Sequence, residues 1–186
     1  MLTPMTEERI QELLSQLEAA SSLDREKAWI ELKPLGESVV PYLAKAYARM
    51  KKREGRIECV FHSLRFARTS ESSFQLGIAA LKDRATLVRY RACGLLAYSL
   101  RSDAIPYLNQ LLDHDDAPTV ADARAAIDAI KNQNHHYFVD RGHSGSSFWE
   151  VNPGDIATGD QKRSLSNSVT KKVLQFLRLP LKTGNT

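Results

Sequence analysis

The chain has 186 residues, of which 42% are hydrophobic and 26% are charged. This length suits one domain, or one domain with a tail, and the composition is that of an ordinary globular protein. No run of about 18 apolar residues occurs, which argues against a membrane-spanning helix. The first residues are polar and acidic where a cleaved secretion signal would be basic and then apolar, so we expect a cytoplasmic protein. Two cysteines are too few for a disulfide framework.

The net charge of +4 lies in the last part of the chain. Six of the 26 basic residues but only two of the 22 acidic residues follow residue 152, so residues 1–152 carry no surplus. Proteins that bind duplex DNA usually carry their positive surplus on the folded body, because affinity comes from neutralising phosphates. This balance argues against nucleic-acid binding, although a sum over residues 1–152 would hide a local basic patch.

Residues 5 to about 132 are predicted to form successive helices, because apolar residues recur three or four positions apart. Thr6 and Asp24 are suited to cap the first two helices. Pro34 and Gly36 are expected to end the second helix, and Pro41 to lie in the first turn of the third. The apolar positions of the series are Ile10, Leu13, Leu14 and Leu17; Trp29, Ile30 and Leu32; Val40, Leu43 and Tyr47; Ile57, Val60, Phe61 and Leu64; Phe74, Ile78 and Leu81; Val88, Ala92, Leu95 and Leu96; Ile105, Leu108, Leu111 and Leu112; and Val120, Ala123, Ile127 and Ile130.

The predicted helices repeat in pairs. The segment Val40-Pro41-Tyr42-Leu43 returns 65 positions later as Ile105-Pro106-Tyr107-Leu108, and Val60 and Leu64 return 32 positions later as Ala92 and Leu96. A period near 32 residues with two helices per unit is typical of an α-solenoid, in which stacked pairs bury a continuous core.

One and a half units resemble a known repeat. The segment 88–96, which opens on Val88-Arg89, is followed by Asp103-Ala104-Ile105-Pro106, and together they resemble the HEAT-like repeat, more narrowly the short bacterial version first named from phycobilisome lyases. A following acidic turn at 115–116 fits the pattern, although the next expected arginine is Ala121. The resemblance covers about two thirds of the chain. It implies an α/α superhelix and a protein-binding role, and it does not imply lyase activity.

The residues after the helices have a different character. Segments 135–140 and 147–152 are aromatic and β-prone around a turn-rich segment, which predicts a β-hairpin that leans on the helices. We therefore divide the chain into a HEAT-like domain (1–134), a hairpin (135–152), and a loop with a basic amphipathic C-terminal helix (153–186). That helix carries the stripe Leu165, Val169, Val173, Phe176 and Leu177, and we expect it to cap the helical row, with a membrane surface or nucleic acid as alternatives.

No catalytic, cofactor-binding or metal-binding residues are assigned. His135, His136 and His143 could approach a zinc ion, but adjacent residues on a strand point to opposite faces. We interpret the acidic residues 113, 115 and 116 as part of a solvated turn between helices. Cys59 has His62 three residues away, which could serve as the base of a nucleophilic cysteine. Both cysteines lie in apolar segments, however, and such segments favour buried thiols.

The proposed partner-binding residues lie on the second helix of each pair, which is expected to line the concave side. They are Tyr42, Lys45 and Arg49, with Tyr107, Asn109, Gln110 and Asp113 at the later unit. Tyrosine and arginine are favoured anchors at interfaces, although both tyrosines could instead pack between units.

These observations favour a non-catalytic protein-binding scaffold. Its most concrete form is an immunity-type protein that covers a toxin, because the His143-Ser144-Gly145 and Trp149 ending is similar to that of some small bacterial HEAT-like proteins from toxin–immunity neighbourhoods. Nucleic-acid binding or DNA-lesion processing is the main alternative, and a chromophore-lyase-like enzyme is a lesser one.

Overall fold

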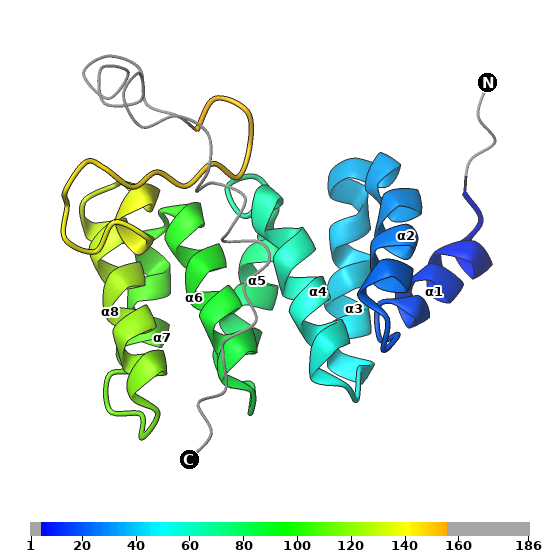
Figure 1. The fold of residues 1–186 in the computed structure, drawn as a ribbon, viewed down its shortest axis with the longest axis horizontal. Helices are drawn as coiled ribbons and strands as arrows, with labels where there is room; N and C mark the ends of the chain where they lie inside the picture. Colours follow the sequence, from blue (N-terminus) through cyan, green and yellow to red (C-terminus); the bar gives the residue numbers. More distant parts are fainter. Residues whose placement is uncertain (1–4, 156–186) are drawn as a thin grey trace.

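The computed structural model describes residues 5–155, and every regular element within them is a helix (Figure 1). The predicted all-α class is therefore confirmed for this part of the chain. The α-helices are α1 (Glu7–Gln16), α2 (Ser22–Leu32), α3 (Val40–Arg49), α4 (Arg53–Ser63), α5 (Glu71–Ala80), α6 (Thr86–Ser99), α7 (Ile105–Asn109) and α8 (Ala117–Lys131). Short 3-10 helices occupy Lys33–Val39, Leu64–Phe66, Ser102–Ala104 and His135–Phe138.

Local signals set most of the helix ends. The Thr6 hydroxyl accepts a hydrogen bond from the Arg9 amide at 3.3 Å, which is the predicted cap of α1. Ser21, and not Asp24, caps α2, so Asp24 lies in the first turn where its charge suits the helix dipole. Pro41 lies in the first turn of α3 as predicted. Gly36 has a φ of 59°, a left-handed conformation that favours glycine after the end of α2.

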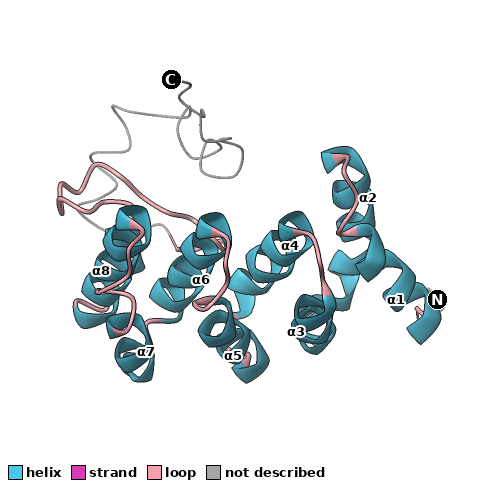
Figure 2. Cartoon of the chain, turned by 90° about the horizontal axis from the view of Figure 1, so that it is seen from below, coloured by secondary structure: helices cyan, strands magenta, loops and turns pink. Residues whose placement is uncertain are grey.

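The helices form two layers. Helices α1, α3, α5 and α7 make one layer, called here the odd layer, and α2, α4, α6 and α8 make the even layer (Figure 2). The helices that pack across the layers are α1 with α2, α3 with α4, α4 with α5, α5 with α6, and α7 with α8. Those that pack within a layer are α1 with α3, α3 with α5, α4 with α6, and α6 with α8. Each pair thus buries its apolar faces against its neighbours.

An arginine recurs at the fourth residue of three even-layer helices. Arg25, Arg56 and Arg89 each donate a hydrogen bond from Nη1 to a carbonyl of the preceding turn, at 2.7, 2.9 and 2.7 Å. Each also pairs with a carboxylate further along the chain, at 3.0, 2.6 and 2.7 Å; the partners in order are Glu58, Asp83 and Asp116. This arginine ladder links every helix pair to the next one.

The apolar interior divides into two clusters. The N-terminal core joins buried residues of α1, α2 and α3 with Cys59 of α4. The C-terminal core runs from Val60 of α4 to Trp149 beyond the last helix. Tyr47 packs against both clusters, so α3 and α4 mark the junction between them.

The β-hairpin predicted for residues 135–152 is wrong. His135–Phe138 form a 3-10 helix, and the described residues that follow include no strand. Side chains take the place of a partner strand: the Trp149 amide donates to His136 Nδ1 at 3.0 Å, and the amides of Val151 and Asn152 donate to the Asp155 carboxylate at 3.0 and 2.7 Å. Because these amides already have acceptors, this segment needs no strand pairing.

The predicted C-terminal amphipathic helix lies outside the described residues. The division of the chain at residues 134 and 152 remains a prediction.

Candidate protein-binding surface

The predicted binding residues of α3 are partly occupied by α1. The Tyr42 hydroxyl donates to the Glu7 carboxylate at 2.8 Å, and Arg49 Nη2 donates to the Gln11 side-chain oxygen at 3.1 Å. The hydrogen bonds from Gln11 and Tyr42 lower the pKa of Glu7. Tyr42 is half-buried by this packing, whereas Lys45 is exposed. Tyr42 and Arg49, which were predicted to bind a partner, therefore already contact α1.

The predicted residues of the later unit are more open. Tyr107 is 43% exposed, which makes it one of the exposed large hydrophobic residues of the described chain. Asn109, Gln110 and Asp113 are exposed beside it. Helices α3 and α7 lie in the odd layer with α5 between them (Figure 2). The two predicted groups thus share a layer but are not adjacent.

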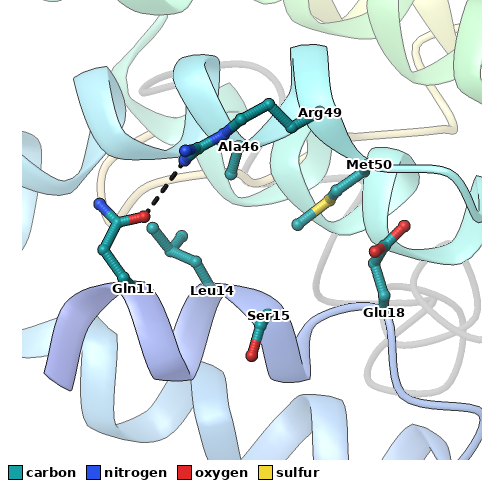
Figure 3. A pocket seen from close by; sticks show the side chains of 7 residues that line it. All are labelled: Gln11, Leu14, Ser15, Glu18, Ala46, Arg49 and Met50. Carbon is teal, nitrogen blue, oxygen red and sulfur yellow. Dashed lines mark hydrogen bonds between the residues drawn. The ribbon is translucent and has the colours of Figure 1, made fainter. Parts of the chain in front are cut away.

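A groove lies between α1 and α3 (Figure 3). It has a volume of about 240 Å³ and is lined by Gln11, Leu14, Ser15, Glu18, Ala46, Arg49 and Met50. Of the predicted residues, only Arg49 lines it. The groove offers mixed apolar and polar contacts, which suit a protein surface better than a small ligand.

A second pocket lies where the α3–α4 turn meets the end of α5 and shares Met50 with the groove. It has a volume of about 420 Å³ and is lined by Tyr47, Met50, Lys51, Arg56, Ala79, Lys82, Asp83 and Arg84. We call it the cationic pocket. None of its residues was among those predicted, although Lys51 and Lys82 lie in equivalent turns one period apart.

The floor of the cationic pocket is a closed polar network. Asp83 accepts hydrogen bonds from Arg56 Nε and Nη2 at 2.6 and 3.1 Å, from the Tyr47 hydroxyl at 2.8 Å and from the Ala85 amide at 2.9 Å. Burial opposes ionisation of Asp83, but these hydrogen bonds outweigh it and lower its pKa. Burial and the bond to Asp83 raise the pKa of Tyr47. The carboxylate is therefore charged and fully engaged.

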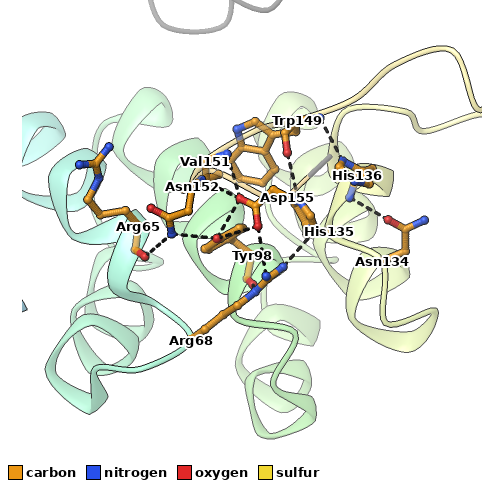
Figure 4. Close-up of polar contacts among 10 residues, drawn as sticks. All are labelled: Arg65, Arg68, Tyr98, Asn134, His135, His136, Trp149, Val151, Asn152 and Asp155. Atoms are coloured by element: carbon orange, nitrogen blue, oxygen red, sulfur yellow. Dashed lines mark hydrogen bonds and ion pairs between the residues drawn. The ribbon is translucent and has the colours of Figure 1, made fainter. Parts of the chain in front are cut away.

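A second polar network fastens the segment after α8 (Figure 4). The Asp155 carboxylate accepts from the Tyr98 hydroxyl at 2.9 Å and pairs with Arg68 at 3.3 Å. Although burial acts against ionisation, the hydrogen bonds from the Asn152 and Val151 amides and from the Tyr98 hydroxyl lower the pKa of Asp155. The network is internally satisfied, which indicates a structural role.

The paired histidines belong to this fastening. His135 contacts Arg68 Nη2 through Nδ1 at 3.0 Å and the Trp149 carbonyl through Nε2 at 2.9 Å. Because Arg68 can only donate, Nδ1 accepts and Nε2 carries the proton. Burial is the main cause that lowers the pKa of His135 to about 4, so the ring is neutral near pH 7.

The described residues offer no metal centre: no group of three or more His, Cys, Asp or Glu side chains among them could hold an ion. His143, predicted as a possible partner of His135 and His136, instead stacks on Tyr137 with ring centroids 3.7 Å apart and pairs with Asp128.

The cysteines lie in the interior, as their apolar segments predict. Both thiols are free and buried, and burial raises the pKa of each one. His62 stacks on Trp29 with centroids 3.7 Å apart and pairs with Glu58 at 3.1 Å. Cys59 is therefore a neutral, inaccessible thiol, which is unsuited to nucleophilic attack.

Within residues 5–155, none of the helices has both the length and the apolar character needed to cross a bilayer. No protein-family model matches this sequence, and a search of curated proteins finds no match to it.

Proposed function

We propose that the chain is a non-catalytic protein-binding scaffold of the HEAT-like superhelical type. Three features support the repeat: the sequence period near 32, the two-layer row of helix pairs, and the arginine ladder that joins each pair to the next. The ladder includes Arg89 of the Val88-Arg89 pair on which the resemblance rests.

The observation that carries the binding role is the contrast between interior and surface. The buried polar groups around Asp83 and Asp155 have partners within the chain, whereas the odd layer exposes Tyr107 beside polar side chains and carries the groove next to Arg49. Exposed aromatic side chains flanked by hydrogen-bonding groups are favoured anchors for a protein partner. An immunity-type protein that covers a toxin is the most concrete form of this proposal.

Affinity capture tests the proposal. The purified chain is used to capture a partner from its native cells, and the affinity for the identified partner is then measured for Tyr107→Ala/Asn109→Ala. The matched control is Arg124→Ala/Lys131→Ala, which alters exposed residues of α8 in the even layer. We expect the first variant to weaken binding about 30-fold, since an aromatic anchor contributes about 2 kcal/mol. Equal affinities for both variants would contradict the assignment of the odd layer.

The immunity form of the proposal predicts inhibition of a toxin. A captured toxin should lose its activity when one equivalent of the natural chain is added, and it should stay active when the Tyr107 variant is added instead at the same concentration. A captured partner without toxic activity would support the scaffold function but refute the immunity role.

Nucleic-acid binding is the second candidate, because Lys51, Lys82 and Arg84 gather at the cationic pocket. A band shift with duplex DNA at physiological salt, abolished by Lys45→Glu/Arg49→Glu or by Lys51→Glu/Lys82→Glu, would support this candidate over the first.

A further inference from the structure

The cationic pocket has walls of one charge sign. Lys51, Lys82 and Arg84 line it and are exposed, and no ion pair within the described residues involves any of the three. Arg84 Nη2 donates to the Lys51 carbonyl at 3.2 Å, which holds the α3–α4 turn beside the α5–α6 turn. Two turns that are about 30 residues apart in sequence thus present their cations to one space.

The acid in the pocket does not neutralise these cations. Asp83 is buried, and its oxygens accept from Arg56, Tyr47 and the Ala85 amide. Its charge is balanced by Arg56, whose side chain is only 9% exposed. The side chains of Lys51, Lys82 and Arg84 therefore give the pocket a net positive charge. Met50 and Ala79 add apolar contacts at the wall.

The flanks of the pocket carry the opposite charge. The turns at the lower edge of Figure 1 include the α1–α2 turn and the turn after α7. The first contains Glu18, and the second contains the exposed residues Asp113 and Asp115, whereas Asp116 pairs with Arg89. The Lys52 amide donates to the Glu18 carboxylate at 2.7 Å, and the Lys52 ammonium donates to the Glu18 carbonyl at 3.2 Å, so both groups are held at the α1–α2 turn. A long polyanion that followed this edge would leave the pocket and meet carboxylates on both sides. A short anionic segment would meet only the cations.

We propose that the cationic pocket binds an acidic segment of a partner protein, with one or two of its carboxylates between Lys51, Lys82 and Arg84. Arg84 supplies a planar fork for a carboxylate, and the two lysines supply point charges around it. Met50 and Ala79 contact the apolar part of the same segment. This assignment rests on the proposed protein-binding function and adds the chemical class of the partner surface.

The test uses two defined probes of matched length. One is a six-glutamate peptide, and the other is a six-nucleotide single strand of thymidines. Each is titrated into the isotope-labelled full chain while amide chemical shifts are followed. We expect the peptide to shift the amides of residues 50–52 and 79–84, with an affinity that falls as salt rises. The oligonucleotide should bind more weakly.

A pair of charge-matched variants makes the test specific. Lys51→Glu/Lys82→Glu should weaken peptide binding at least tenfold. Lys33→Glu/Lys131→Glu, which reverses two exposed lysines elsewhere, should change it by less than twofold. Shifts spread over the surface, equal losses in the two variants, tighter binding of the oligonucleotide, or no binding of the peptide would each overturn the proposal.

The same variants separate this inference from the function on which it rests. A captured partner that binds Lys51→Glu/Lys82→Glu as tightly as it binds the natural chain would refute the pocket assignment and leave the scaffold function standing. Peptide binding confined to the pocket, in a chain that captures no protein partner, would support the pocket chemistry and count against the scaffold function.

Discussion

The two cores of the molecule are built from different side chains. The buried residues of the N-terminal core are aliphatic or small, and its aromatic residues are only partly buried. The C-terminal core buries Phe74, Tyr98, Phe138 and Trp149, two of which come from the segment after α8. Helix pairing alone therefore closes one end of the row, whereas the other end depends on the segment after α8, which contains only a short 3-10 helix among its described residues.

The junction between the cores is polar. Tyr47 contacts both clusters, and its hydroxyl donates to Asp83, which pairs with Arg56. A buried ion pair adds little net stability, but the loss of one member leaves the other charge buried without its partner. The junction should therefore be the most sensitive point of the row.

Asp83→Ala tests this sensitivity and should have the largest effect. We expect it to lower the free energy of unfolding by about 3–5 kcal/mol, because Arg56 would remain buried without a counter-charge. Urea unfolding followed by circular dichroism measures the change. Asp103→Ala provides the contrast, since Arg101 and Asp103 pair at the surface with side chains 35% and 59% exposed. That loss should be less than about 1 kcal/mol.

Truncations in each core test whether the cores respond separately. Leu13→Ala and Leu96→Ala should each lower the free energy of unfolding by about 2–5 kcal/mol, because both leucines are fully buried. Hydrogen exchange should then show faster exchange in α1–α3 for Leu13→Ala, with the amides of α6 and α8 still protected. Uniform acceleration across all helices would show that the two clusters unfold as one unit.

Acid should weaken the C-terminal end in particular. The pKa of His135 is about 4 in the folded chain, below the ordinary value of 6.5, so the unfolded chain binds more protons below pH 6.5. Stability should therefore fall by about 1–2 kcal/mol from pH 7 to pH 5 through this group. A proton on Nδ1 would face Arg68, and the neighbours His136, Tyr98 and Asp155 set the remaining local field.

Thermal unfolding at several pH values measures this effect. His135→Gln should flatten the dependence between pH 7 and pH 5. The same slope in this variant and in the natural chain would assign the acid sensitivity to other groups.

The smallest effect is expected at the surface of the N-terminal end. Tyr42→Phe removes only the exposed hydrogen bond to Glu7 and keeps the ring, so the midpoint of thermal unfolding should move by less than about 2 °C. A larger shift would show that the contact between α1 and α3 contributes more to the N-terminal core than its exposure suggests.

Apolar spacing predicted the helices well because their buried apolar residues recur three or four positions apart, although α6 buries every residue from Ala92 to Ser99. The Thr6 cap and the place of Pro41 followed from rules that act within a few residues. The cationic pocket did not follow, since no local rule tells which turns meet in space. The β-hairpin prediction for residues 135–152 was wrong for another reason. The aromatic residues of this segment suit burial in any extended backbone, and His136 and Asp155 accept hydrogen bonds from the amides that a partner strand would otherwise satisfy.

The arginine ladder gives the row a direction. Each rung joins a guanidinium to a carboxylate that comes later in the chain, so an internal helix pair has one kind of end for its predecessor and a complementary end for its successor. A duplicated internal pair would find an ion-pair partner on both sides. Proteins of this design can therefore change length by gain or loss of whole pairs, and a lengthened version of this chain with a second copy of residues 53–85 should fold with one additional rung.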